Sequence, residues 1–162
     1  MVCPSLNILG IMSGTSLDGL DLAIVQIDFV AGKYSFKIKK SQTVKYSNEW
    51  EERLKNARFL SGEKLTQLNI DFGRLLGNEA KSFCDEPIDL IASHGHTVFH
   101  QPELGVTLQI GSLNEISLIT GVKTVGDFRT IDVAKGGQGA PLVPIGDMFL
   151  FGEYDYCINL GG

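Results

Sequence analysis

The stretch SGTSLDGLD, residues 13–21, places small hydroxyl residues, glycines and carboxylates between two apolar runs. Its first four residues can offer backbone N–H groups and hydroxyls in a turn, where glycine lets another group approach the main chain closely. Such a turn can hold a phosphate. A plain hairpin turn is the alternative, because Gly, Asp, Ser and Thr also supply ordinary turn geometry. No lysine follows the glycine as in a Walker A loop, so spacing alone leaves both interpretations open.

Two carboxylates in this stretch, Asp18 and Asp21, are spaced so that they can hold a divalent cation or orient its waters. Mg²⁺ keeps most of its water shell in proteins and uses few side-chain ligands. The pair therefore predicts a magnesium role beside the turn.

Three histidines lie close together in the stretch SHGHTVFH, at His94, His96 and His100. An H-x-H pair on one strand face with a third histidine nearby is a plausible zinc ligand set. The apolar run 88–93 leads directly into this stretch, and polar residues at the carboxyl end of a strand commonly form a ligand pocket in open α/β sheets. Zinc binding, a ligand pocket and simple packed histidines all remain open.

An acid and a base, Asp127 and Arg129, follow a predicted strand in the stretch GDFRTID. An arginine fork matches a carboxylate of a ligand, but an ordinary ion pair that holds the loop is equally consistent with the sequence. Gln138, in KGGQGAP, can hydrogen-bond sugar hydroxyls. Glycine flexibility with Pro141 as a stop explains that composition equally well.

The elements that position these residues begin with three strands, expected over residues 7–12, 20–29 and 34–46. Tight turns between them predict an antiparallel meander. Two amphipathic helices follow, with Ser47 and Ser61 as their N-caps. Pro87 marks the change from helix to strand.

Strand and helix then alternate, with strands expected over 88–93, 106–110 and 122–126. Ser112 and Glu115 have the spacing of a capping box, which predicts a helix that ends at Gly121. The stretch 135–144 is too rich in Gly and Pro for a regular element, and a short helix is expected over 145–150. A meander followed by βαβα units predicts an α/β fold with a mixed sheet and helices on both faces.

Composition excludes several classes of partner. The net charge of −5 leaves no basic stripe for nucleic acid or an anionic membrane. Three widely spaced cysteines without a CxxC pattern favour a reducing compartment. No apolar window approaches the roughly 20 residues that span a bilayer, and the N-terminus lacks a signal-peptide pattern. A cytoplasmic protein with no membrane partner is expected.

Five motifs in order, GIMSGTSLDGLD, SHGHTVFH, LQIG, VGDFRTIDVAKGGQGAPLVP and INLGG, closely resemble the 1,6-anhydro-N-acetylmuramic acid kinases, bacterial enzymes of cell-wall (peptidoglycan) recycling. The resemblance runs nearly from end to end. It implies the ribonuclease H-like fold of actin and sugar kinases, in which two similar lobes close on a nucleotide. Residues 1–154 would form the N-terminal lobe, and residues 155–162 the first strand of a truncated second lobe.

The resemblance also implies the reaction. Water opens the internal 1,6-anhydro bond of the sugar while O6 receives the γ-phosphoryl group of ATP, which gives N-acetylmuramic acid 6-phosphate. ATP and Mg²⁺ are the implied cofactors. Met12 stands where many other sugar kinases of this fold carry an Asp, which shifts the implied metal-holding role to Asp18 or Asp21.

Implied site residues fall into two groups. Those for the ATP phosphates are Gly14, Thr15, Ser16, Leu17, Asp18, Gly19, Leu20 and Asp21. Those for the sugar are His94, Thr97, Asp127, Arg129 and Gln138, with the lactyl carboxylate on Arg129.

The family's general base, an Asp, lies downstream of INLGG, so the resemblance implies a base beyond Gly162, the last residue of this sequence. A general base must reach its water, so we expect negligible kinase activity from these 162 residues alone. Two other functions remain open at this point. One is a metal-dependent hydrolase built on His94, His96 and His100; the other is a non-catalytic binding or dimerisation lobe, for which a homodimer is possible.

Overall fold

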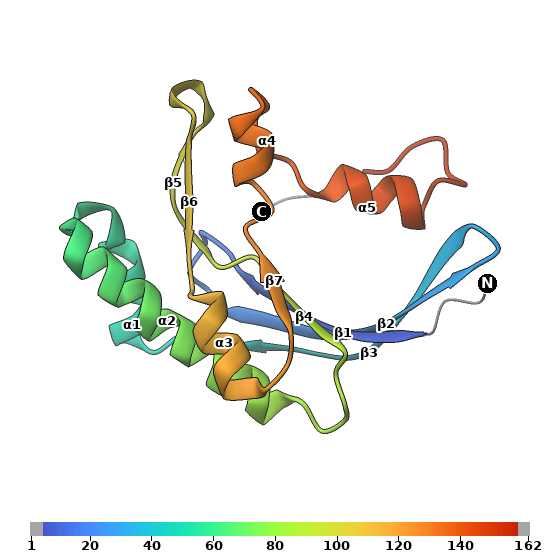
Figure 1. Ribbon diagram of the computed structural model, residues 1–162, viewed down its shortest axis with the longest axis horizontal. Coiled ribbons are helices and arrows are strands. Elements are labelled where there is room, and N and C mark those ends of the chain that lie inside the picture. The colour runs from blue at the N-terminus through green and yellow to red at the C-terminus, as the bar shows by residue number, and fades with distance from the viewer. Residues whose placement is uncertain (1–4, 159–162) are drawn as a thin grey trace.

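The computed structural model describes residues 5–158 (Figure 1). In chain order the elements are β1 (Leu6–Ser13), β2 (Leu20–Val30), β3 (Lys33–Val44), α1 (Asn48–Lys55), η1 (Ala57–Phe59), α2 (Gly62–Phe83), β4 (Leu90–Ser93), β5 (His96–Gln101), η2 (Pro102–Leu104), β6 (Val106–Ile110), α3 (Leu113–Thr120), β7 (Thr124–Gly126), α4 (Thr130–Ala134) and α5 (Val143–Leu150).

The main sheet has five strands in the order β3-β2-β1-β4-β7. Strands β1, β2 and β3 pair antiparallel, whereas β1, β4 and β7 run parallel. The predicted meander and the mixed α/β sheet are confirmed. Because β1 lies in the middle, its carboxyl end is flanked by the start of β2 on one side and the end of β4 on the other.

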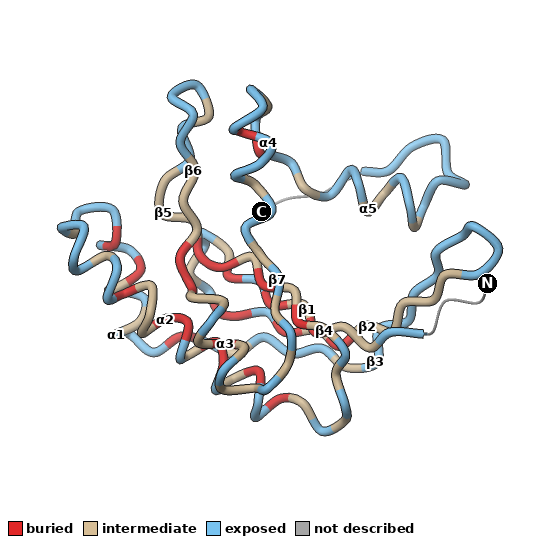
Figure 2. Tube along the Cα trace, in the orientation of Figure 1, coloured by how far each residue is buried: buried red, intermediate tan, exposed pale blue. Residues whose placement is uncertain are grey.

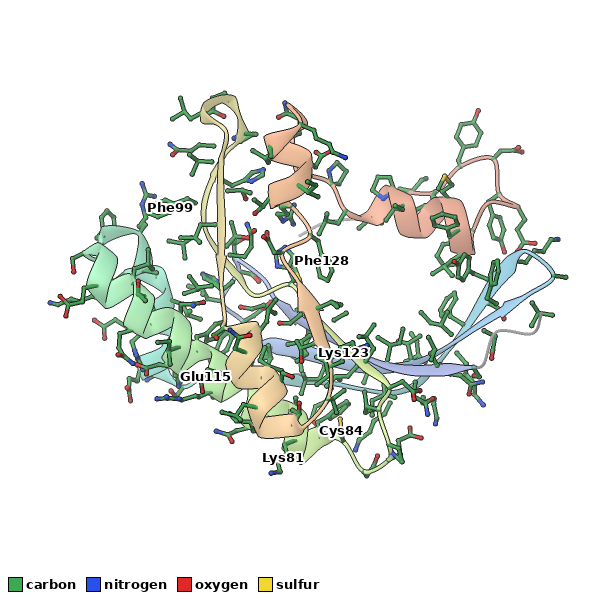
Figure 3. The ribbon with its side chains drawn as sticks, in the orientation of Figure 1. Lys81, Cys84, Phe99, Glu115, Lys123 and Phe128 are labelled. Carbon is green, nitrogen blue, oxygen red and sulfur yellow. The ribbon has the colours of Figure 1, made fainter. Side chains whose placement is uncertain are left out.

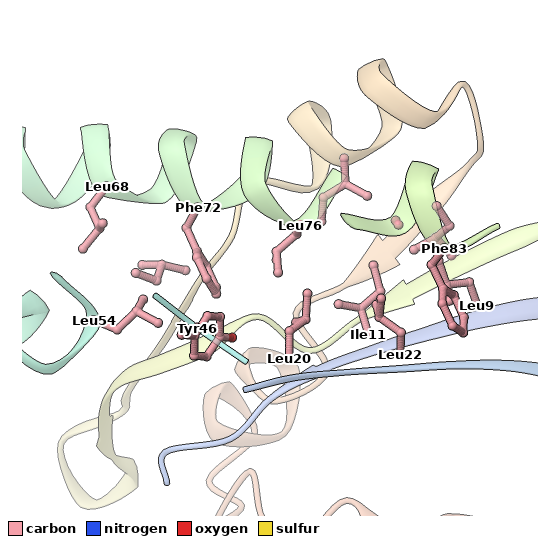
Figure 4. Close-up of a cluster of buried hydrophobic side chains, with 14 of the residues drawn as sticks. Leu9, Ile11, Leu20, Leu22, Tyr46, Leu54, Leu68, Phe72, Leu76 and Phe83 are labelled. Atoms are coloured by element: carbon pink, nitrogen blue, oxygen red, sulfur yellow. The ribbon is translucent and has the colours of Figure 1, made fainter. Parts of the chain in front are cut away.

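Helix α2 covers one face of this sheet and forms the core with it (Figure 4). Leu9 and Leu22 from neighbouring strands and Phe72 and Leu76 of the helix are almost fully buried and belong to the same hydrophobic cluster. Burial of one such side chain stabilises the fold by about 1.5–3 kcal/mol. Helices α1 and α3 lie beside α2 on the same side of the sheet (Figure 1).

The helix caps predicted from sequence are confirmed. The hydroxyl oxygens of Ser47, Ser61 and Ser112 each accept a hydrogen bond from the backbone N–H three residues later. Gly121 ends α3 in the left-handed conformation, with φ of 70°. Local side chains therefore fix where these three helices begin or end.

The hairpin of β5 and β6 corrects the expected architecture. Strand β5 was not predicted, and β6 pairs with it as a separate two-stranded sheet. Gly95, directly before β5, has φ of +71°, and a Cβ atom there would lie 2.4 Å from the Ile110 carbonyl oxygen. This sharp, crowded bend turns the chain out of the main sheet after β4.

Two smaller differences concern the helices of the last third of the chain. Helix α4 was not predicted, and α5 begins at Val143 with Pro144 in its first turn, so it includes the end of a stretch expected to be irregular. Proline is tolerated there because first-turn N–H groups have no helical partner.

The strand expected over 155–162 is described only in part. Residues 155–158 have no regular secondary structure, so a strand is not found there. The remainder of that expected strand, from residue 159 to Gly162, lies outside the described residues. The expected general base beyond Gly162 is not part of this sequence and stays a prediction.

The opposite face of the sheet is covered less closely (Figure 2). Helix α5 approaches it at β3, where the rings of Tyr34 and Phe149 meet edge to face at 5.4 Å. Nearer the middle of the sheet lies an open cavity of about 710 Å³, and Phe128, labelled in Figure 3 just past β7, is one of its lining residues. Among residues 5–158, no helix has the length and apolar character needed to cross a membrane.

Candidate functional site

The residues with candidate chemistry gather at the carboxyl ends of the three parallel strands. Gly14 follows β1, His94 follows β4 and Asp127 follows β7. The sheet register places Ile11 of β1 beside Ser93 of β4, and Ser93 in turn beside the end of β7. This common edge, here called the site edge, is where open α/β sheets bind ligands.

The turn between β1 and β2 is held by its own short contacts. The Leu17 N–H donates to the Gly14 carbonyl at 3.4 Å, and the Ser16 hydroxyl donates to Asp18 at 2.8 Å. Gly19 has no room for a side chain, since a Cβ atom would lie 2.7 Å from the Val44 carbonyl oxygen. Thr15 and Ser16 are exposed at the tip of the turn, so a ligand can reach their hydroxyls and backbone.

The Ser13 side chain differs from the sequence interpretation. The residue is 2% exposed, and its hydroxyl points into the core, where it accepts a hydrogen bond from the Tyr46 hydroxyl at 2.8 Å. The His96 Nδ1 atom lies 3.2 Å from the same oxygen. Ser13 therefore cannot offer its hydroxyl to a phosphate, and that part of the expectation is wrong.

The two carboxylates of the turn are oriented separately. Asp21 accepts a hydrogen bond from the Thr43 hydroxyl at 2.5 Å, while Asp18 is held by Ser16. Asp21 is also the register partner of Met12, so both side chains project from the same face of the sheet. Both carboxylates are exposed. Each carboxylate can supply a ligand to a magnesium ion that keeps most of its waters.

His94 and Arg129 form a hydrogen-bonded pair at the site edge. The Arg129 Nε–H donates to His94 Nε2 at 2.9 Å, and its Nη1–H donates to the Gly139 carbonyl at 2.6 Å. His94 Nδ1 lies 2.9 Å from the Gly95 carbonyl oxygen, which can only accept, so these partners assign a neutral His94 with its proton on Nδ1. No carboxylate among the described residues forms an ion pair with Arg129.

Burial supports the neutral state of His94. It lowers the pKa of His94, and the nearby Arg129 charge lowers that pKa further, although the bond to the Gly95 carbonyl opposes the shift. Burial also lowers the pKa of Arg129. A half-buried guanidinium without a carboxylate partner is a strong binding group for an anion.

The three histidines do not form one cluster. His94 is bonded to Arg129, His96 is buried beside Ser13, and His100 is exposed and bonded to Thr107. Within residues 5–158, no group of three or more His, Cys, Asp or Glu side chains is placed to hold a metal ion. The geometry thus gives no support to a zinc hydrolase.

A polar cavity of about 370 Å³ opens beside His94, between β4, β6 and α3. Two buried polar atoms, Ser93 Oγ and Gln109 Oε1, have no hydrogen-bond partner within residues 5–158, and both residues line this cavity. Buried polar atoms without partners are costly, and these two leave unused hydrogen-bonding capacity at the wall of the cavity. The other polar lining residues are Asn69, His94, Thr107, Ser112, Asn114, Asp127 and Thr130.

Comparison with known proteins decides the family. The model of the anhydro-N-acetylmuramic acid kinases matches residues 6–162, nearly the whole chain. This chain belongs to the anhydro-N-acetylmuramic acid kinase family.

Curated members of the family are similar along almost all of this chain. The kinase of Pseudoalteromonas translucida is 37% identical over 98% of this chain, and that of Synechococcus elongatus is 38% identical over 97%. The kinase of Bacillus cereus strain AH187 is 37% identical over 89%. The chain spans only 45% of the first two relatives and 41% of the third, so it corresponds to less than half of a curated kinase.

Not all sugar-site residues implied by the family resemblance meet at the polar cavity. His94 and Asp127 line it, and Arg129 lies next to His94. Thr97 accepts a hydrogen bond from the Gln109 amide at 3.3 Å without lining the cavity, and Gln138 is exposed in the glycine-rich loop.

Several cavity residues were missed in the sequence. Gln109 lies within the LQIG motif and Ser93 directly precedes His94, so a signal for both was present. Asn69 on α2 and Asn114 on α3 had none, because their sequence context indicates only helix.

Proposed function

We propose that this chain is the nucleotide- and sugar-binding lobe of an ATP-dependent kinase that acts on 1,6-anhydro-N-acetylmuramic acid in the cytoplasm, in peptidoglycan recycling. The observation that carries the proposal is the convergence at one sheet edge of an exposed hydroxyl-rich turn, a polar cavity, and an arginine that has no carboxylate partner among the described residues. The antiparallel meander continued by parallel strands supports the ribonuclease H-like class implied by the family.

In the proposed reaction, water attacks C1 of the sugar and the C1–O6 bond breaks. O6 takes the γ-phosphoryl group of ATP, ADP leaves, and the water proton passes to a general base. The products are N-acetylmuramic acid 6-phosphate and ADP. Phosphoryl transfer depends mainly on positioning and charge stabilisation, which backbone N–H groups and a cation can supply.

The turn from Gly14 to Asp21 would hold the ATP phosphates. The hydroxyls and main chain of Thr15 and Ser16 are its accessible donors, and Gly19 lets the turn pack against the end of β3. Asp21 and Asp18 would hold a hydrated Mg²⁺, which neutralises phosphate charge when bound.

The sugar would lie in the polar cavity and its surroundings. Arg129 would bind the lactyl carboxylate, which distinguishes a muramic sugar from plain glucosamine, because its guanidinium has no acidic partner within residues 5–158. Ser93 and Gln109 would bind hydroxyl or acetamido groups. Among the other residues implied by the family resemblance, His94 and Asp127 line the cavity, while Thr97 and Gln138 would contribute from its periphery.

The general base is expected beyond Gly162, in the part of the family that this chain does not span. We therefore propose that the isolated chain turns over anhydro sugar negligibly. Incubation with ATP, Mg²⁺ and the sugar tests this directly, and robust turnover would contradict it.

Arg129→Ala tests the carboxylate role in the protein at full natural length. Loss of a charge-assisted hydrogen bond costs about 1.5–3 kcal/mol, so kcat/KM for anhydro-N-acetylmuramic acid should fall about 10- to 100-fold. The matched substrate is anhydro-N-acetylglucosamine, which lacks the lactyl carboxylate. On this sugar the variant should lose less, because only the bonds of Arg129 to His94 and Gly139 are removed there. An equal loss on both sugars would contradict the assignment.

A further inference from the structure

A buried chain of three side chains, Tyr46, Ser13 and His96, joins two parts of the site edge. The Tyr46 hydroxyl donates to Ser13 Oγ at 2.8 Å, and Ser13 Oγ lies 3.2 Å from His96 Nδ1. The three residues are 8%, 2% and 5% exposed. They come from separate segments: Tyr46 follows β3, Ser13 ends β1 and His96 begins β5.

This chain of hydrogen bonds lies in apolar surroundings. The ring of Phe72 contacts both Tyr46 and His96, with centroid distances of 6.2 and 6.3 Å, and Figure 4 shows Tyr46 beside Phe72. Apolar side chains of similar size could fill the same space without burying polar groups. What the polar chain adds is a fixed geometry, because each hydrogen bond constrains the distance and direction of its partners.

The proton arrangement is self-consistent when all three groups are neutral. Tyr46 donates its one proton to Ser13, which leaves the Ser13 proton free for His96 Nδ1. Burial raises the pKa of Tyr46 to about 12 and lowers the pKa of His96, so burial keeps both groups uncharged.

The hydrogen-bonded side chains of Tyr46, Ser13 and His96 connect the two ligand regions, because Ser13 and His96 are sequence neighbours of residues in those regions. Ser13 directly precedes Gly14, the first residue of the candidate phosphate turn. His96 directly follows Gly95, whose carbonyl accepts the hydrogen bond from His94. A shift of Ser13 would therefore move His96, which lies at the base of the hairpin and next to the His94–Arg129 pair.

We propose that Tyr46, Ser13 and His96 are positioning residues that couple the phosphate turn to the sugar pocket, so that each ligand binds more tightly when the other is bound. They act through the turn and the hairpin, since their buried side chains touch neither ligand region directly. This inference rests on the proposed function.

The test measures the affinity for 1,6-anhydro-N-acetylmuramic acid with and without a saturating, non-hydrolysable ATP analogue and Mg²⁺, in the protein at full natural length. The ratio of the two dissociation constants is the coupling. We expect a ratio of about 10 for the wild type and a ratio within about twofold of one for Tyr46→Phe and His96→Ala. His96→Asn should restore coupling, because its amide places a hydrogen-bonding atom near the position of Nδ1.

Tyr34→Phe is the matched control, since it removes the same hydroxyl from an exposed tyrosine of β3 and should keep the full coupling. Tyr46→Phe removes a single oxygen and carries the test if His96→Ala fails to fold. Coupling that persists in Tyr46→Phe, or a wild type that binds both ligands independently, would overturn the inference and leave the proposed function standing. A wild type that binds neither ligand would instead contradict the proposed function.

Discussion

The helix-covered face of the sheet and the site edge are built from the same strands but obey different rules. On β1, Leu9 and Ile11 are 0% and 3% exposed under α2, whereas Met12, beside the turn, is 41% exposed. The helix-covered face is an apolar core with ordinary backbone geometry. At the site edge, Ser93 and Gln109 each have a buried polar atom without a hydrogen-bond partner in the part of the chain that the structure describes.

Backbone conformation shows the same contrast. Leu17 and Asp127, both at the site edge, have φ of 60° and 56°, in the left-handed region that non-glycine residues seldom adopt. The third such residue among those described, Ala31 with φ of 53°, lies in the turn between β2 and β3, also outside the helix-covered face. Left-handed non-glycine residues and buried polar atoms without partners both make the free energy of folding less favourable. The comparison teaches that packing accounts for the helix-covered face, whereas the left-handed residues and the buried polar atoms of the site edge are the features that the proposed ligand role would explain.

The largest expected loss of stability comes from a substitution on the helix-covered face. Phe72→Ala removes a fully buried ring from the centre of the core and should lower the free energy of unfolding by about 3–5 kcal/mol. Urea denaturation measures this. Phe59→Ala, at a position 75% exposed, is the control and should change stability by less than about 0.5 kcal/mol. An equal loss of stability in both variants would contradict the assignment of Phe72 to the centre of the core.

A substitution at the site edge should leave stability unchanged and lower activity. Thr15→Val keeps the shape of an exposed side chain but removes its hydroxyl, so stability should change by less than about 0.5 kcal/mol. In the full-length protein, loss of a hydrogen bond to a charged phosphate should lower kcat/KM for ATP about 10- to 100-fold. Steady-state kinetics with ATP as the varied substrate measures it. An unchanged rate would count against the phosphate role.

A smaller expected effect is the dependence of the free energy of unfolding on pH. Burial lowers the pKa of both His94 and His96. As pH falls through about 6.5, the unfolded chain takes up protons at these residues before the folded protein does, so the free energy of unfolding should decrease. It should level off below the folded-state pKa values.

Urea midpoints at a series of pH values between about 8 and 5.5 measure this dependence. His96→Asn removes one of the two groups and should reduce the slope. Wild-type stability that stays constant over this range would contradict the buried, neutral state of the histidines.

Much of the fold could be predicted because its signals are local. Ser47, Ser61 and Ser112 cap helices through bonds to residues three positions away. The hairpin could not be placed in the same way, because the chain leaves the main sheet at the bend at Gly95, before β5, and the crowding at that bend comes from Ile110, which is distant in sequence.

The site was predictable in outline and not in detail. The turn and the positions of His94 and Asp127 follow from strands that end in polar residues. The direction of the Ser13 hydroxyl does not, because its partners Tyr46 and His96 lie 33 and 83 residues away in sequence. Local hydroxyl-rich composition suggested a ligand role that these tertiary contacts remove.

The central claim is that the turn after β1 binds the phosphates of ATP, and a crystal structure of the full-length protein with Mg²⁺ and a non-hydrolysable ATP analogue tests it most directly. The account predicts phosphate oxygens within hydrogen-bond distance, about 2.7–3.2 Å, of the backbone N–H groups or hydroxyls of Thr15 and Ser16. A triphosphate bound elsewhere, with this turn free of contacts, would contradict it.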